Sequence, residues 1–261
     1  MQQVELTSID GVRLDAAFHQ APAGKKLGAV IQVHGINANM TEGGMFVRLA
    51  DRLADASFDV LRFSFRGHGG SGGTQRGVTL AGELLDLQAA VEYVVKRFPG
   101  GLSIVASSFG AVSTLLSLPW LDDHLDRLVL WNPVLDLRRT FLSPELPWGK
   151  ENFGSDQQKL LSSQGFLTLD GEFEVGRVFF EELRHYQPRD YLAASSVPTL
   201  VVHGDRDQAV SYEIAREAVV ARPNTDFHTV RGSDHGFDTR AREDEAVAVT
   251  TDWLTKYGEG A

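Results

Sequence analysis

The sequence of 261 residues contains no cysteine. Disulfides, a thiolate nucleophile and cysteine metal ligands are therefore excluded from this chain. No apolar run approaches the roughly 20 residues that a membrane-spanning helix needs, so we expect no membrane span. The first residues, MQQVELTSID, lack the basic and then apolar pattern of a secretion signal, and we therefore expect a cytoplasmic protein.

Positive charge is scarce as well, since 25 lysines and arginines stand against 35 aspartates and glutamates, giving a formal net charge of −10. This balance disfavours nucleic acid and anionic membrane surfaces as partners. No clustered His/Asp metal pattern occurs, and neither does the phosphate-binding pattern G-x-x-x-x-G-K-[ST]. One match to G-x-G-x-x-G, at 67–72, is followed by five residues, 73–77, where a dinucleotide site needs a helix at once. We expect no metal and no nucleotide.

Apolar runs and helical stripes alternate along the chain from residue 27 onward, after a leading hairpin that turns at Asp10-Gly11. This rhythm predicts an α/β fold, a mostly parallel sheet with helices on both faces. The predicted strands are 4–9, 12–18, 27–33, 60–65, 102–106, 125–131, 199–203 and 225–230, and the predicted helices are 46–56, 80–97, 109–118, 211–220 and 243–256.

Residues 133–190 interrupt the rhythm with almost sixty residues and no predictable sheet strand. A structureless loop of that length is improbable, so we expect an inserted cap within one single domain whose core is 1–132 and 191–261. A hairpin over 166–175 and a helix over 178–185 are the elements expected in the cap. Its many aromatic side chains fit an apolar roof over a site and equally a small core of the cap itself, and both interpretations can hold for different residues.

The predicted strand 102–106 and helix 109–118 are separated only by Ser107 and Ser108. So tight a turn holds the residue at its tip, Ser108, at an unusual φ/ψ with its side chain exposed. Small residues two positions before and after the tip let the strand and helix pass closely. The pattern A-x-S-x-G is that of a nucleophile elbow with alanine in place of the first glycine. A serine that merely caps the helix is the alternative.

Two polar clusters follow later strands. Asp205 and Asp207 come after the strand 199–203, and His235 comes after the strand 225–230. Reactive groups gather at the C-terminal ends of strands in an open parallel sheet. A serine nucleophile needs a base, and the base needs an acid that orients it, so these clusters supply the candidates for both.

With these motifs the chain resembles α/β-hydrolases over nearly its full length. The motifs in order are the leading hairpin, HG at 34–35, FRGHG at 65–69, the elbow, HGDRDQAV at 203–210 and DHGF at 234–237. The resemblance implies the α/β-hydrolase fold, with Ser108 as the nucleophile, His235 as the general base and Asp207 as the acid.

Other acidic and histidine side chains fit these roles less well. The resemblance leaves Asp136 as an alternative position for the acid, and we expect Asp205 to hold its loop by accepting backbone N–H groups. His228 lies inside a predicted strand, where packing decides its role. We expect His34 and His68 to stabilise their turns.

Two backbone N–H groups are needed to bind the oxyanion. The N–H of Phe109, directly after the nucleophile, is one candidate, and the resemblance implies Ile36, in the loop after the strand 27–33, as the other. The side chains of both residues either line the pocket or simply pack in the core.

The expected function is a serine carboxylester hydrolase that works through an acyl-enzyme on a small-molecule ester and needs no cofactor. The size and position of the cap resemble those of small cinnamoyl/feruloyl-type esterases, which implies small aromatic or medium acyl esters, with Trp148 and Phe173 expected to bind the substrate. A thioesterase, a monoacylglycerol-type lipase and a non-catalytic ligand-binding α/β-hydrolase are the alternatives. The sequence leaves a homodimer open.

Overall fold

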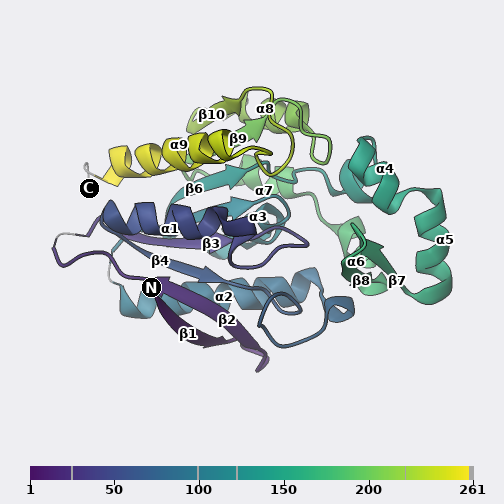
Figure 1. The fold of residues 1–261 in the computed structure, drawn as a ribbon, viewed down its shortest axis with the longest axis horizontal. Coiled ribbons are helices and arrows are strands. Elements are labelled where there is room, and N and C mark those ends of the chain that lie inside the picture. The colour runs from purple at the N-terminus through teal and green to yellow at the C-terminus, as the bar shows by residue number, and fades with distance from the viewer. Residues whose placement is uncertain (25, 99, 122, 221, 259–261) are drawn as a thin grey trace.

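A sheet of eight strands forms the centre of the computed structural model, which describes residues 1–24, 26–98, 100–121, 123–220 and 222–258. The strands are β1 (Gln2–Thr7), β2 (Arg13–His19), β3 (Gly28–Val33), β4 (Phe58–Phe63), β5 (Leu102–Ser107), β6 (Leu125–Trp131), β9 (Thr199–Gly204) and β10 (Thr225–Val230). Their order in the sheet is β1-β2-β4-β3-β5-β6-β9-β10. The pairs β1–β2 and β2–β4 are antiparallel and the other pairs are parallel, so the predicted mostly parallel sheet is confirmed (Figure 1).

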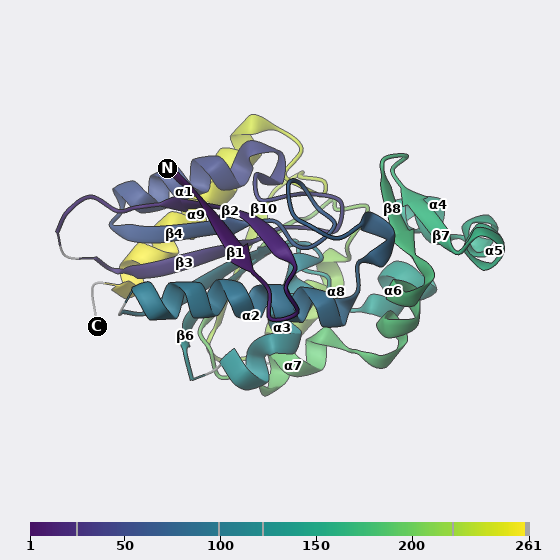
Figure 2. The same ribbon diagram turned by 90° about the horizontal axis from the view of Figure 1, so that it is seen from below.

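Helices cover both faces of this sheet, as predicted. They are α1 (Met45–Asp55), α2 (Leu80–Arg97), α3 (Gly110–Leu121), α7 (Pro188–Ala194), α8 (Tyr212–Val220) and α9 (Arg240–Gly258). Side chains of α1 and α9 share one buried cluster with the sheet, and side chains of α2, α3, α7 and α8 share another (Figure 2). Val30 belongs to the first cluster and Ile31 to the second, because successive residues of a strand face opposite layers.

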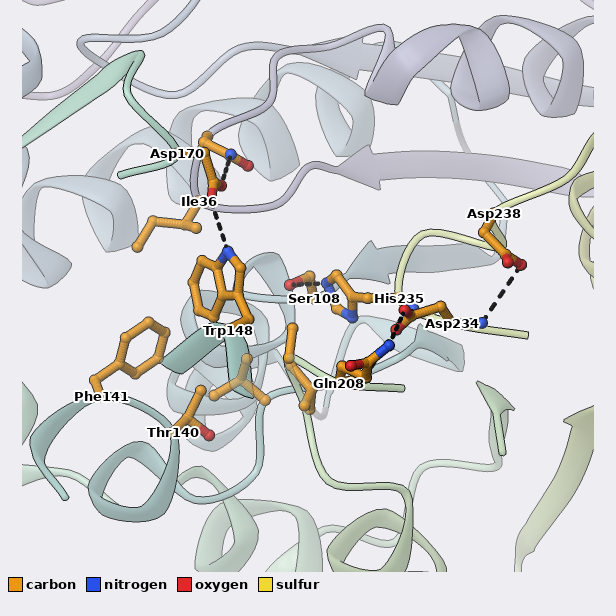
Figure 3. A pocket seen from close by; sticks show the side chains of 14 residues that line it. Ile36, Ser108, Thr140, Phe141, Trp148, Asp170, Gln208, Asp234, His235 and Asp238 are labelled. Carbon is orange, nitrogen blue, oxygen red and sulfur yellow. Dashed lines mark hydrogen bonds between the residues drawn. The ribbon is translucent and has the colours of Figure 1, made fainter. Parts of the chain in front are cut away.

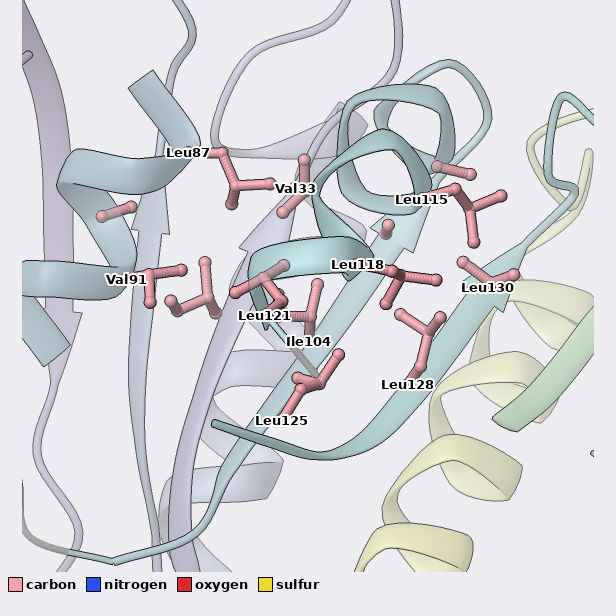
Figure 4. Close-up of a cluster of buried hydrophobic side chains, with 14 of the residues drawn as sticks. Val33, Leu87, Val91, Ile104, Leu115, Leu118, Leu121, Leu125, Leu128 and Leu130 are labelled. Carbon is pink, nitrogen blue, oxygen red and sulfur yellow. The ribbon is translucent and has the colours of Figure 1, made fainter. Parts of the chain in front are cut away.

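Packing between α2, α3 and the central strands fixes the turn that follows β5. Leu115 and Leu118 of α3 are buried with Ile104 of β5 and Leu128 of β6 (Figure 4). Each buried leucine stabilises the fold by roughly 1.5–3 kcal/mol. Strand β5 and helix α3 are therefore held rigidly on either side of the residues that join them.

The cap lies at one end of the sheet, at the right of Figure 1, and comprises α4 (Pro147–Phe153), α5 (Ser155–Gln164), β7 (Phe166–Leu169), β8 (Phe173–Gly176) and α6 (Arg177–Glu182). Strands β7 and β8 form a separate antiparallel hairpin whose turn contains Asp170 and Gly171, both at positive φ. The expected hairpin of the cap is thus present. The expected boundary at residue 190 falls inside α7, which packs on α3 and places Leu192 in a cluster of the main sheet.

Several contacts tie the cap to the rest of the chain. Arg76, in a short 3-10 turn (Gln75–Gly77), pairs with Glu174 of β8 at 2.8 Å, and the carboxylate of Glu182 accepts the N–H of Leu80 at the start of α2. One buried cluster also contains side chains of both parts. Across the ranges described above, none of the helices combines the length and the apolar character that crossing a bilayer requires.

Candidate active site

Ser108 occupies the tight turn between β5 and α3. Its φ is +51°, in the left-handed region that non-glycine residues rarely adopt, as expected for the tip of an elbow. A methyl group at Gly110 would lie only 2.5 Å from the carbonyl oxygen of His34, so the start of α3 can approach the end of β3 only with glycine there. The turn is fixed further because the Ser108 N–H donates to the carbonyl of Trp131 at 2.8 Å.

Ser108, His235 and Asp207 are brought together in one hydrogen-bonded chain. His235 Nε2 lies 3.0 Å from Ser108 Oγ, and His235 Nδ1 lies 2.7 Å from Asp207 Oδ2. An Nδ1–H that donates to the carboxylate leaves Nε2 as the acceptor for the serine hydroxyl. Burial disfavours the charged imidazole, but the carboxylates of Asp207, Glu42 and Asp234 outweigh burial and raise the pKa of His235.

The carboxylate of Asp207 is held on both oxygens. Oδ1 accepts the N–H groups of Ala209 and Val210 at 2.9 and 2.8 Å, and Oδ2 also lies 3.1 Å from His203 Nε2. Although burial opposes its charge, His235 and His203 lower the pKa of Asp207. An ionised carboxylate in this position favours the Nδ1–H tautomer of His235 and stabilises the imidazolium form.

The alternative acids lie elsewhere. Asp205 is exposed and accepts the N–H of Gly232 in the neighbouring loop. Asp136 accepts the N–H of Arg139 at 2.9 Å and so begins a turn of the cap. Neither contact involves His235, so Asp207 is the aspartate that the fold brings to the histidine.

The loop after β3 carries Ile36 beside the elbow. Within the described part of the chain, no protein acceptor bonds the N–H of Ile36 or of Phe109, the two predicted oxyanion donors. The carbonyl of Ile36 lies 2.7 Å from His68 Nε2, and His34 Nε2 accepts the N–H of Phe65 at 3.0 Å. His34 and His68 thus have the structural contacts that were expected of them, and both hold the loop in place.

A cavity of about 320 Å³ opens above Ser108 and His235 (Figure 3). Its lining is Ile36, Asn37, Ser108, Val134, Thr140, Phe141, Trp148, Asp170, Gln208, Ala209, Val210, Asp234, His235 and Asp238. Of the two expected substrate-binding aromatics, Trp148 is in this lining. Phe173 is not, because its buried ring stacks on His68 with the ring centroids 4.5 Å apart.

Three residues near the site are not predicted as site residues from the sequence. The sequence predicts Asp170 only as a turn residue, yet its carboxylate accepts hydrogen bonds from Trp148 Nε1–H and Asn37 Nδ2–H, both at 2.8 Å. His203 stands in the motif HGDRDQAV, and its spacing to Asp207 was the available signal. Glu42 carries no motif, although its carboxylate lies under the loop that carries Ile36.

Comparison with known proteins gives one family and several relatives. Residues 24–163, more than half of the chain, match the family described as serine aminopeptidase, S33. The protein YfhR of Escherichia coli O157:H7 is 27% identical over 219 residues, which is 81% of this chain. The chain spans 65% of the length of that relative.

Solved structures of esterases are similar over almost the whole chain. Est1E from Butyrivibrio proteoclasticus, with ferulic acid bound, has a TM-score of 0.78 at 22% identity, and the match covers 97% of this chain and 97% of that one. The Pyrococcus furiosus esterase Pf2001 has a TM-score of 0.74 at 21% identity, with 98% of this chain and 90% of that one covered. The predicted fold class is confirmed by these matches.

Proposed function

Because this chain belongs to the serine aminopeptidase S33 family of α/β hydrolases, we propose that it is a serine hydrolase that cleaves carboxylic esters through an acyl-enzyme. The observation that carries the proposal is the chain of contacts Ser108–His235–Asp207, at 3.0 and 2.7 Å, of which Ser108 and His235 line a cavity. Serine is a weak nucleophile, and a base within hydrogen-bond reach is what activates it.

In the proposed reaction, His235 Nε2 takes the hydroxyl proton while Ser108 Oγ attacks the ester carbonyl. The N–H groups of Ile36 and Phe109 stabilise the oxyanion of the tetrahedral intermediate. The intermediate collapses, the C–O bond to the alcohol breaks, and His235 returns the proton to the leaving oxygen. Water then attacks the acyl-enzyme with His235 again as the base, which releases the acid and restores Ser108.

The lining of the cavity supports a substrate whose acyl or aryl part is apolar. Ile36, Val134, Phe141, Trp148 and Val210 present hydrocarbon or aromatic surface next to Ser108. A cavity of about 320 Å³ has room for a small aromatic or a medium acyl group. Est1E, one of the similar proteins of known structure, has been solved with ferulic acid bound, which agrees with this substrate class.

A second candidate is cleavage of N-terminal amino acids from amides, which the description of the family names. Asp170, Asp234 and Asp238 bring three carboxylates to the cavity wall, where they would face an ammonium group. Their oxygens already accept hydrogen bonds from Trp148, Gln208 and Arg242, respectively, so we favour the ester.

The deciding experiment is a hydrolysis panel run on the parent protein and on Ser108→Ala. The panel contains p-nitrophenyl esters of graded chain length, methyl esters of cinnamic and ferulic acid, monoacylglycerols, acyl-thioesters and aminoacyl p-nitroanilides. We expect turnover of the aryl and medium-chain esters and its loss in the variant. A preference for thioesters, monoacylglycerols or anilides would show that the proposed substrate class is wrong. If no substrate of the panel is hydrolysed, a non-catalytic binding protein is favoured. The cytoplasmic location stays a prediction, and so does the possibility that the protein forms a homodimer.

A further inference from the structure

Glu42 places a second carboxylate behind the proposed nucleophile. Its Oε2 accepts the N–H of Gly35 at 3.0 Å, and its Oε1 accepts the hydroxyl of Ser107 at 3.0 Å. Gly35 belongs to the loop that carries Ile36, and Ser107 directly precedes Ser108. One carboxylate therefore joins the loop of one proposed oxyanion donor to the strand that presents the nucleophile.

The backbone around Glu42 is built so that its side chain can reach this position. Glu42 itself has a φ of +44°, a left-handed conformation that is unfavourable for any residue with a side chain. A methyl group at Gly35 would lie 3.3 Å from Ser108 Cβ and 3.4 Å from Glu42 Oε1, so a side chain there would push at least one neighbour away by a few tenths of an ångström. A strained non-glycine residue whose side chain points at the site is a candidate for a functional role.

Both oxygens of Glu42 act as acceptors, as those of an ionised carboxylate do. Burial raises the pKa of Glu42 above its usual value, and the bonds from Gly35 and Ser107 and the nearby His235 offset only part of that rise. The charged groups that face His235 are Asp207, Glu42 and Asp234, and Ser108 is its neutral partner. Glu42 therefore adds a carboxylate near His235, and this carboxylate has no other function in the proposed reaction.

We propose that Glu42 is a positioning residue that fixes the Gly35–Ile36 loop against the elbow and electrostatically stabilises the imidazolium of His235 during the reaction. The inference rests on the proposed function for its kinetic consequences. Its electrostatic part concerns the resting protein and can be measured without a substrate.

Three substitutions separate charge from shape. In Glu42→Gln the amide can accept the Gly35 N–H and donate to Ser107 Oγ, so the contacts are kept and the charge is lost. Glu42→Asp keeps the charge but shortens the side chain. Glu245→Gln is the matched control, since it removes a carboxylate that lies 2.8 Å from His228 in another part of the molecule.

The pKa of His235 is measured by NMR titration of the imidazole and from the acid limb of kcat/KM for p-nitrophenyl butyrate. We expect the pKa of His235 to fall by about one pH unit in Glu42→Gln and by less in Glu42→Asp, because a unit charge near a titrating group acts with this magnitude. The limiting kcat should fall by about tenfold in Glu42→Gln, with KM within about twofold, since the lost stabilisation belongs to the charged transition state. Glu245→Gln should change neither.

A purely structural role gives the opposite order. The isosteric glutamine would then be close to the parent, the shorter aspartate would be the weaker enzyme, and the pKa of His235 would not move. An unchanged pKa of His235 in folded Glu42→Gln overturns the proposal. Should the glutamine variant not fold, a Glu42→Asp that loses kcat while the pKa of His235 stays unchanged overturns it as well. A parent that cleaves no ester would contradict the proposed function alone, because the NMR titration still reports on Glu42.

Discussion

On the sheet side of the cavity, Ser108, Asp207 and His235 each stand within a few residues of the end of a strand, and their contacts are short hydrogen bonds between polar groups. On the cap side, the wall is formed by Phe141 and Trp148, whose places depend on contacts with one another and with aromatic rings from α4 and α6. The first side is fixed by backbone geometry. The second is fixed by packing between segments that are far apart in the sequence.

This difference predicts a division of labour within the site. Substitutions on the sheet side should change the rate with every substrate, because they alter the groups that we propose to react. Substitutions on the cap side should change the choice between substrates, because apolar surface contributes about 25 cal/mol per Å² that a substrate buries. Cap residues that contact the loop after β3 should be the exception, because their substitution should change the rate with every substrate.

The largest effect is expected on the sheet side, in Asp207→Asn. An amide at this position favours the wrong tautomer of His235, so kcat should fall by roughly 10³–10⁴-fold for long and short esters alike. Asp205→Asn is the matched control, because Asp205 binds only the neighbouring loop, and its effect should appear in thermal stability. A dead Asp205→Asn beside an active Asp207→Asn would reverse the assignment, and if neither mattered Asp136 would become the candidate acid.

An intermediate effect is expected from the two cap aromatics, which should behave differently from one another. Trp148→Ala removes part of the cavity wall and should shift kcat/KM between long and acetate esters by roughly 1–3 kcal/mol. Phe173→Ala removes the ring that stacks on His68, whose Nε2 lies against the Ile36 carbonyl, so all esters should slow by the same factor. Selectivity changes of equal size in both variants would contradict this distinction.

The smallest effect is expected where the cap touches the loop after β3. Asp170→Asn weakens the bonds to Trp148 Nε1 and Asn37 Nδ2, and hydrogen bonds of this kind contribute about 0.5–1.5 kcal/mol each. Asn37→Ala breaks only the bond to the loop. If the contact to the loop matters, both variants should lower kcat/KM for acetate esters by a similar few-fold factor. An effect confined to Asp170→Asn and to long esters would assign Asp170 to the orientation of Trp148 alone.

The sheet side could be predicted because its signals are local. A strand followed at once by a helix, with a glycine two residues after the serine, is enough to predict the left-handed turn at Ser108. The hairpin of the cap could be found for the same reason, since Asp170-Gly171 is a turn pair. The core strands and helices lie within a few residues of their predicted ranges because each has a clear apolar pattern.

The details of the cap could not be predicted because they depend on distant partners. Helix α5 buries only Leu161, so its sequence has no apolar stripe to reveal it. Nothing local in β8 distinguishes a ring that faces the cavity from one that stacks on His68, 105 positions earlier in the chain. Glu42 likewise becomes visible only when the fold brings Gly35 and Ser107 to either side of its carboxylate.

The central claim is that Ser108 is the nucleophile, and active-site labelling tests it most directly. The parent, Ser107→Ala and Ser108→Ala are treated with a fluorophosphonate, and the labelled peptide is mapped by mass spectrometry. Since the hydroxyl of Ser107 is directed to Glu42 and that of Ser108 to His235, the label should be on Ser108 in the parent and in Ser107→Ala, and absent in Ser108→Ala. A label on Ser107, or labelling that persists in Ser108→Ala, would contradict the account.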